Sequence, residues 1–183
     1  ASNILTFSIG VVFRLLFSKS RAPVFTHSTP PFLVFGVSLI CKWKKRPLVY
    51  VLLDIFPEGL VRLGKLRRRS LLTRLWSHMH LKALKRSSRN IVLGRDMLQW
   101  LNDFYPEGAS KAQYIPHWQN EELIKPAQYS QSPFVEKLDL THQFTVQYSG
   151  NMGLWNDMVS FGKAAGMLQD EMAFVFIGGG IKK

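Results

Sequence analysis

Acidic residues are scarce in the first half of this chain, which makes its charge strongly uneven. Residues 1–96 hold 18 lysines and arginines against three acids, whereas residues 97–183 hold six against nine. The first half therefore has a formal net charge of +15 and the second half one of −3. This distribution predicts that the first half faces a polyanion, which could be a membrane surface or nucleic acid.

Cysteine is almost absent, and long uninterrupted apolar runs are missing. Cys41 is the single cysteine, which excludes an intrachain disulfide and fits a reducing compartment. The apolar stretches at 4–17 and 31–43 are shorter than the ~20 residues that a membrane span needs. We therefore expect both to be buried helices of an α/β domain. The first residues contain no charged leader segment, so no signal peptide is expected.

Short β-rich runs alternate with helical segments along the chain. The expected strands are 22–28, 47–54, 90–94, 112–116, 144–150 and 172–178, and the expected helices are 3–19, 31–43, 66–88, 95–104 and 153–168. This alternation predicts an α/β fold with Rossmann-like parallel sheets and helices on both faces. The run at 47–54 is apolar throughout, which is typical of a strand buried on both faces. The polar stretch at 117–142 is interpreted as a connection.

A strand, a glycine turn and a helix follow one another at residues 144–158, which read FTVQYSGNMGLWNDM. Glycine lets the backbone turn tightly and approach a ligand closely. We expect the helix to begin near Leu154, and the N–H groups at a helix start favour a phosphate. A purely structural turn is the alternative. The candidate phosphate-binding residues are Gly150, Asn151, Met152 and Gly153.

Five segments occur in an order that resembles a known enzyme family. They read VYVLLDIFPEGLVRLGKL (49–66), NIVLGRDM (90–97), YIPHWQNEELIKP (114–126), FTVQYSGNMG (144–153) and AFVFIGGGIKK (173–183). The succession resembles the GT-B glycosyltransferases of family 4, especially the branch that builds bacterial surface and capsular polysaccharides. Against the family pattern, His117 stands where asparagine is usual, and Gln119-Asn120 where valine and aspartate are frequent.

The resemblance implies a partial two-domain GT-B architecture. Residues 1–142 would be the C-terminal part of an acceptor-side Rossmann-like domain plus a linker. Residues 143–183 would be the first β-α-β unit of a donor-side domain. The family's first glycine loop would lie upstream of Ala1, and its E-x₇-E segment downstream of Lys183. We therefore expect a fragment, through natural truncation or an incomplete sequence, that is inactive alone.

The resemblance also implies the reaction, which is transfer of a sugar from a nucleotide-diphosphate sugar to a lipid-linked or saccharide acceptor. The nucleotide sugar is a substrate, so no cofactor is expected. No metal is expected either, since the histidines and acids show no close metal-ligand spacing. The glycine turn would hold the donor's diphosphate. Gly178, Gly179 and Gly180 would form a second donor-side loop, with a flexible turn as the alternative.

Three residues near strand ends are candidates for the acceptor side. In open α/β sheets, ligands gather at the carboxyl ends of the strands. Asp54 could be a general base or orient the acceptor hydroxyl, and capping the turn before Pro57 is the alternative. Glu58 and His27 could line the same cleft. Alternatively, Glu58 could only start a helix, and His27 could be a half-buried structural histidine.

The predicted helix at 66–89 separates basic from apolar residues at about 100° per residue. One face holds Leu72, Trp76, Met79 and Ala83, and the opposite face holds Arg67, Arg74, His78, Lys82, Lys85 and Arg89. No acid interrupts this basic face, so we expect an anionic membrane contact at the cytoplasmic face of the cell membrane, with a solvated surface as the alternative. No nucleic-acid module is recognisable, so nucleic acid is not an expected partner. The alternative function is a non-catalytic basic α/β module that binds an anionic membrane or nucleic acid.

Overall fold

The structure, a computed structural model, describes residues 2–140, 144–153 and 156–180. The chain divides into two compact units, Ala1–Trp118 and Gln119–Lys183. The domain boundary expected at residue 142 falls within the second of these units.

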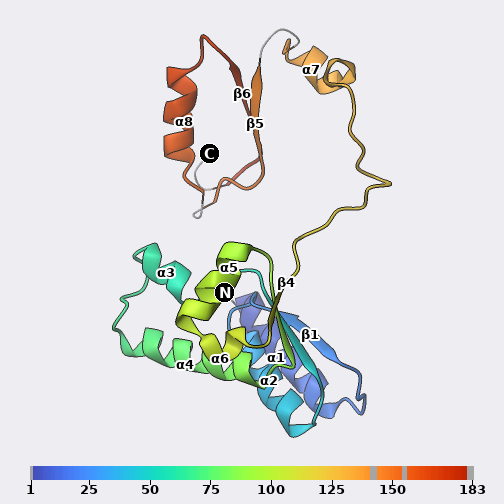
Figure 1. The fold of residues 1–183 in the computed structure, drawn as a ribbon, viewed down its shortest axis with the longest axis vertical. Helices are drawn as coiled ribbons and strands as arrows, with labels where there is room; N and C mark the ends of the chain where they lie inside the picture. The colour runs from blue at the N-terminus through green and yellow to red at the C-terminus, as the bar shows by residue number, and fades with distance from the viewer. Residues whose placement is uncertain (1, 141–143, 154–155, 181–183) are drawn as a thin grey trace. The chain divides into compact units, whose positions relative to one another are not determined.

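Four parallel strands form the sheet of the first unit, in the order β1-β2-β3-β4 (Figure 1). The strands are β1 (Val24–His27), β2 (Leu48–Leu52), β3 (Arg89–Val92) and β4 (Ala112–Tyr114). Their crossovers carry α2 (Leu33–Trp43), then α3 (Glu58–Arg62) and α4 (Leu71–Arg86), then α5 (Arg95–Phe104) and α6 (Pro106–Ala109). The predicted α/β fold with parallel, Rossmann-like sheets is confirmed.

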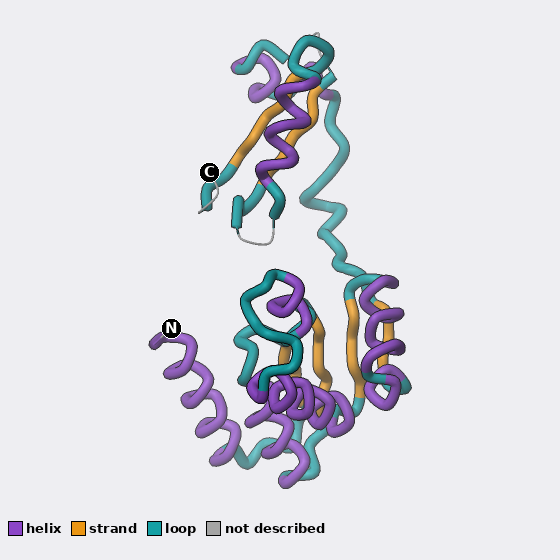
Figure 2. Tube along the Cα trace, turned by 90° about the vertical axis from the view of Figure 1, so that its left-hand side faces the viewer, coloured by secondary structure: helices purple, strands orange, loops and turns teal. Residues whose placement is uncertain are grey.

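The connecting helices cover one face of this sheet (Figure 2). Since the strand order follows the chain order and parallel crossovers share one hand, successive helices lie on the same side. Along β2, Leu48, Tyr50 and Leu52 are buried, whereas Val49 and Val51 on the other face are only partly buried. The prediction of burial on both faces of β2, with helices on both sides, is therefore wrong for the described residues.

The core lies between the sheet and its helices. Its largest cluster joins side chains of the sheet with those of α2, α4 and α5, including Val34, Tyr50, Leu52, Trp76, Leu84, Val92 and Leu101. A smaller cluster joins α2 to α1 (Ser2–Phe17) and contains Cys41. Burial raises the pKa of the Cys41 thiol, and the charge of Arg46 opposes that rise.

The two N-terminal helices differ in burial. Most apolar side chains of α2 are buried, as predicted. By contrast, α1 packs on α2 through Val11, Val12 and Leu15, while Phe7 and Phe13 are 56 % exposed. The prediction that α1 is a buried helix is therefore wrong. No helix in the described part of the chain is long and apolar enough to cross a membrane.

The second unit contains a parallel pair of strands, β5 (Thr145–Ser149) and β6 (Ala173–Ile177), joined by α8 (Met158–Met167). The stretch that precedes them, interpreted as a connection, includes a 3-10 turn, η1 (Tyr129–Gln131), and the short helix α7 (Pro133–Lys137). Asp157 caps α8, because its carboxylate accepts a hydrogen bond of 3.2 Å from the Ser160 N–H. The described helix therefore begins at Met158, and the expected start near Leu154 lies outside the described residues.

Candidate functional site

The carboxyl ends of β1 and β2 are tied together by Ser28, which follows β1 directly. The Ser28 N–H donates to the Val51 carbonyl at 3.0 Å, which extends the β1–β2 pairing by one residue. Its hydroxyl oxygen accepts from the N–H groups of Leu53 at 3.0 Å and Asp54 at 2.9 Å. Because Ser28 is 2 % exposed, this junction fixes the backbone that carries Asp54.

Asp54 lies at the edge of the sheet where the sequence places it, with an exposed side chain. The Thr29 hydroxyl donates to Asp54 Oδ2 at 2.9 Å, so one carboxylate oxygen is held in a defined position. A carboxylate held in this way can accept the proton of a bound hydroxyl or orient it. His27 is exposed at the end of β1, and no hydrogen bond or ion pair joins it to Asp54.

Glu58 begins α3 and forms a long-range contact that sequence reasoning missed. The Tyr105 hydroxyl, at the end of α5, donates to Glu58 Oε1 at 2.6 Å. Burial raises the pKa of Tyr105, the bond to Glu58 raises it further, and a hydrogen bond with Ser77 opposes the rise. Glu58 Oε2 is buried and has no partner. Glu58 therefore both starts a helix and presents a carboxylate oxygen inside the protein.

His80 lies behind this group, 2 % exposed, with its ring 5.3 Å from that of Tyr105 and 5.8 Å from that of Tyr50. Burial lowers the pKa of His80 to about 4, so it is neutral at neutral pH. Within the described ranges, no group of three or more His, Cys, Asp or Glu residues is arranged to hold a metal ion.

The two glycine loops of the second unit lie against each other. The Gly150 N–H donates to the Ile177 carbonyl at 2.9 Å, and the Met152 N–H to the Gly179 carbonyl at 2.8 Å. A Cβ added at Gly178 would overlap the Gly150 carbonyl oxygen. The structure thus brings the two predicted donor-side loops, 150–153 and 178–180, together at the carboxyl ends of β5 and β6.

The prediction places a phosphate at the start of the helix that follows the glycine turn, but the available N–H groups lie in the loop itself. The N–H groups of Gly150 and Met152 are used between the loops, whereas those of Asn151 and Gly153 form no hydrogen bond within the described residues. The start of α8 carries the carboxylate of Asp157, which repels an anion at that end of the helix. Loop amides rather than the helix start are therefore the groups available to a phosphate.

The basic face predicted for the helix at 66–89 is shorter in the structure. Ser70 caps α4 by accepting from the Thr73 N–H at 3.2 Å, so the helix begins at Leu71. Arg67 precedes the helix and Arg89 belongs to β3. Of the predicted basic face, Arg74, His78, Lys82 and Lys85 are exposed on α4. Leu72, expected on the buried face, is 52 % exposed.

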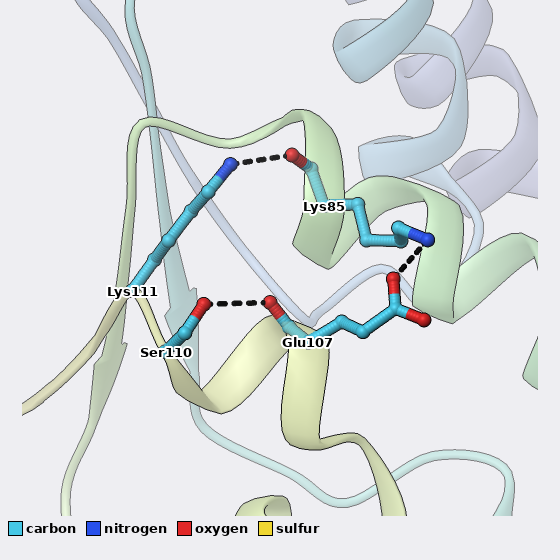
Figure 3. Close-up of polar contacts among 4 residues, drawn as sticks. All are labelled: Lys85, Glu107, Ser110 and Lys111. Atoms are coloured by element: carbon cyan, nitrogen blue, oxygen red, sulfur yellow. Dashed lines mark hydrogen bonds and ion pairs between the residues drawn. The ribbon is translucent and has the colours of Figure 1, made fainter.

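An acid from another helix meets this basic surface. Figure 3 shows Lys85 paired with Glu107 of α6, while Lys111 Nζ donates to the Lys85 carbonyl at 2.6 Å. Lys111 Nζ also donates to the Ser87 carbonyl at 3.1 Å, which closes the C-terminal end of α4. Both partners of the Lys85–Glu107 pair are about half exposed, so the pair adds little stability.

Three contributors to these sites were not singled out from the sequence. Ser28 and Thr29 follow β1 as Asp54 follows β2, so pairing the two strand ends would have found them. Tyr105 is 47 residues from Glu58, and no local pattern indicates that contact.

Together, the first unit is a parallel α/β sheet with polar residues at its carboxyl edge, and the second is a parallel strand pair with two glycine loops. No protein-family model matches the chain. A curated protein, "Probable glycosyltransferase WbjE" from Pseudomonas aeruginosa, is 27 % identical over 159 residues, which are 86 % of this chain. The chain spans 38 % of that relative's length. The similarity supports a general relationship to glycosyltransferases.

Proposed function

We propose that this chain is part of a GT-B glycosyltransferase of family 4. The reaction would transfer a sugar from a nucleotide-diphosphate sugar to a lipid-linked or saccharide acceptor in the synthesis of a surface polysaccharide. The observation that carries the proposal is the pair of interlocked glycine loops at the carboxyl ends of β5 and β6. The similarity to a probable glycosyltransferase supports it.

The donor's diphosphate would bind at the glycine loops through backbone amides. The N–H groups of Asn151 and Gly153 are the candidates, since those of Gly150 and Met152 bond to the second loop. Backbone N–H groups in tight turns form concave sites for anions. Such donors matter most when negative charge develops on the leaving diphosphate in the transition state.

The acceptor hydroxyl would be deprotonated or oriented at Asp54. Its carboxylate is exposed, and Thr29 holds one of its oxygens at 2.9 Å. The buried Ser28 hydroxyl fixes the backbone N–H of Asp54, so the carboxylate projects from a rigid junction. Preorganisation of this kind lowers the cost of orienting a base toward its substrate.

Calorimetric titration of the chain with a panel of nucleotide-diphosphate sugars tests the donor loop. A Cβ at Gly153 would meet only the mobile end of the Asn151 side chain, so Gly153→Ala should fold normally. It would nevertheless obstruct a phosphate that approaches the loop. We expect at least tenfold weaker binding for Gly153→Ala and loss of binding for Gly150→Val, whose φ is 154°.

Gly162→Ala is the matched control, because it lies in α8 and a Cβ there meets no atom within 4 Å of it. Unchanged binding in Gly153→Ala and Gly150→Val would refute the donor loop. Equal losses in all three variants would also refute it, because the effect would then not depend on the loop.

The exposed surface of α4 would contact an anionic membrane, at the cytoplasmic side of the cell membrane. Arg74, His78 and Lys82 are exposed there, and Leu71, Leu72 and Leu75 are exposed on its first two turns. Cations beside exposed leucines suit the interface between lipid headgroups and acyl chains. Each lysine or arginine near an anionic surface contributes ~1 kcal/mol, which is about fivefold in affinity.

Sedimentation with anionic and neutral vesicles tests this contact. We expect salt-sensitive binding to anionic vesicles that Arg74→Ala and Lys82→Ala each weaken about fivefold. Lys163→Ala, on α8 of the second unit, is the control. Binding to duplex or single-stranded DNA in place of vesicles would overturn the membrane contact.

A further inference from the structure

A cavity lined by both apolar and charged side chains lies in the first unit, among α3, α4 and α5. Its volume is about 320 Å³, within the range of small-molecule sites. The lining includes Glu58 and Arg62 from α3, Ser77 from α4 and Trp100 from α5. The segment before α4 adds Arg68. Three helices and a loop therefore supply a carboxylate, a hydroxyl, two guanidinium groups and an aromatic ring to one space.

The carboxylate of Glu58 is only half satisfied by the protein. Oε1 accepts from the Tyr105 hydroxyl at 2.6 Å, whereas Oε2 is buried without a partner. Among the described residues, the one ion pair joins Lys85 to Glu107, so neither Arg62 nor Arg68 pairs with Glu58. A buried charged oxygen without a donor is costly. This oxygen is therefore suited to a ligand that brings a hydroxyl group.

The other residues of the cavity lining indicate which further groups the ligand carries. The exposed guanidinium groups of Arg62 and Arg68 outnumber the single carboxylate, which leaves one positive charge on the lining. Guanidinium groups bind phosphate or carboxylate in a planar, two-pronged manner. Trp100 stacks on Phe104 with ring centroids 5.7 Å apart, so one wall is aromatic and apolar. A flat apolar wall suits the C–H face of a sugar ring.

We propose that this cavity is a binding subsite for a sugar that carries one anionic group, either a phosphate or a carboxylate. A ring hydroxyl donates to Glu58 Oε2, the anionic group pairs with Arg62 and Arg68, and the ring lies on the Trp100–Phe104 wall. That the sugar belongs to the acceptor rests on the function proposed above.

Ligand-observed NMR titrations of the 183-residue chain test the subsite with glucose 1-phosphate, glucuronate, glucose and inorganic phosphate. We expect one or both anionic sugars to bind at least tenfold more tightly than glucose or phosphate. Which of the two binds more tightly identifies the anionic group. Equal affinity for glucose would overturn the proposal, and so would equal affinity for inorganic phosphate, because each removes one half of the proposed ligand.

Two matched pairs of variants locate the binding. Glu58→Gln keeps the shape and an acceptor for Tyr105, but it removes the charged acceptor of the ring hydroxyl and one negative charge from the lining. It should therefore lower the affinity for the anionic sugar relative to that for inorganic phosphate about tenfold, whereas Glu107→Gln on α6 should not. Arg68→Ala should weaken anionic-sugar binding about tenfold, whereas Arg69→Ala, its exposed neighbour outside the cavity lining, should not. An unchanged affinity ratio in Glu58→Gln together with unchanged binding in Arg68→Ala would overturn the subsite.

Nucleotide-sugar binding, measured on the same samples, separates this proposal from the preceding one. Donor binding without binding of the anionic sugars would overturn the subsite and leave the donor loop in place. Binding of the anionic sugars, sensitive to Glu58→Gln, without donor binding would support the subsite and count against the glycosyltransferase assignment.

Discussion

Removal of one hydroxyl, in Tyr105→Phe, should lower the free energy of unfolding of the first unit by about 2 kcal/mol. The bond from Tyr105 to Glu58 Oε1 is 2.6 Å long, within the range of hydrogen bonds to an ionised oxygen. Such bonds contribute about 1.5–3 kcal/mol. Tyr105 is 6 % exposed, and Glu58 Oε2 already has no partner, so the variant leaves both carboxylate oxygens without a protein donor.

Urea unfolding followed by tryptophan fluorescence measures this loss. Trp76 and Trp100 are 5 % and 7 % exposed and belong to the core of the first unit, so their emission reports its unfolding. Tyr114→Phe is the matched control, because Tyr114 is at the surface of β4 and 36 % exposed. We expect that control to change the free energy of unfolding by less than about 0.5 kcal/mol.

A double-mutant cycle with Glu58→Leu, which removes the acceptor of the Tyr105 hydroxyl, isolates the pair. If the bond contributes as argued, the two changes should be non-additive by about 1 kcal/mol or more, because either one removes the same interaction. A Tyr105→Phe variant within about 0.5 kcal/mol of the parent would refute the reasoning. Additive effects in the cycle would refute it equally, since they would locate the loss elsewhere.

Three further predictions concern separate parts of the chain. The pKa of His80 falls from 6.5 to about 4 on folding, so the stability it contributes is present above pH 6.5 and is lost as the pH falls toward 4. In His80→Leu, the decline of stability over that pH window should be less steep, and an equally steep decline would contradict the assignment. Gly178→Ala should accelerate hydrogen exchange at the Gly150 amide, because the added Cβ overlaps the Gly150 carbonyl oxygen, whereas Gly179→Ala, which meets no described atom within 4 Å, should not. Lys111→Met should lower the free energy of unfolding by about 1 kcal/mol in thermal denaturation, since it removes the donor to the last carbonyls of α4, and an unchanged midpoint would contradict that role.

The fold could be predicted from the sequence because its signals are local. Apolar runs and their spacing place every strand of both sheets, and the predicted helix at 95–104 coincides with α5. Helix starts were predicted less well. Ser70 and Asp157 each form a cap that begins the helix five residues later than expected for α4 and α8. Serine and aspartate are preferred residue types at the N-cap, so attention to caps in addition to hydrophobicity would have located both starts.

The candidate site residues differ in the same way: positions set by local sequence could be predicted, whereas contacts set by packing could not. The position of Asp54 at the end of β2 could be predicted, because a strand end can be located from sequence order alone. Its partner Thr29 is 25 residues away, and only the pairing of β1 with β2 brings the two together. The Tyr105–Glu58 contact joins α3 to the end of α5, and it depends on how those helices pack, which no local pattern specifies. Burial of Glu58 Oε2, the feature that makes the cavity chemically specific, depends on the same packing.

The glycines of the second unit have two separable explanations, and only one of them bears on a ligand. Gly178 and Gly180 must lack a side chain because a Cβ at either would overlap a backbone oxygen of the opposite loop. Those two glycines would therefore be required even if the loops bound nothing. Gly153 has no such constraint, since only the mobile end of the Asn151 side chain lies near it. If Gly153→Ala leaves the fold intact and weakens nucleotide-sugar binding, the glycine is there for the ligand, and the loop is a donor site rather than a turn.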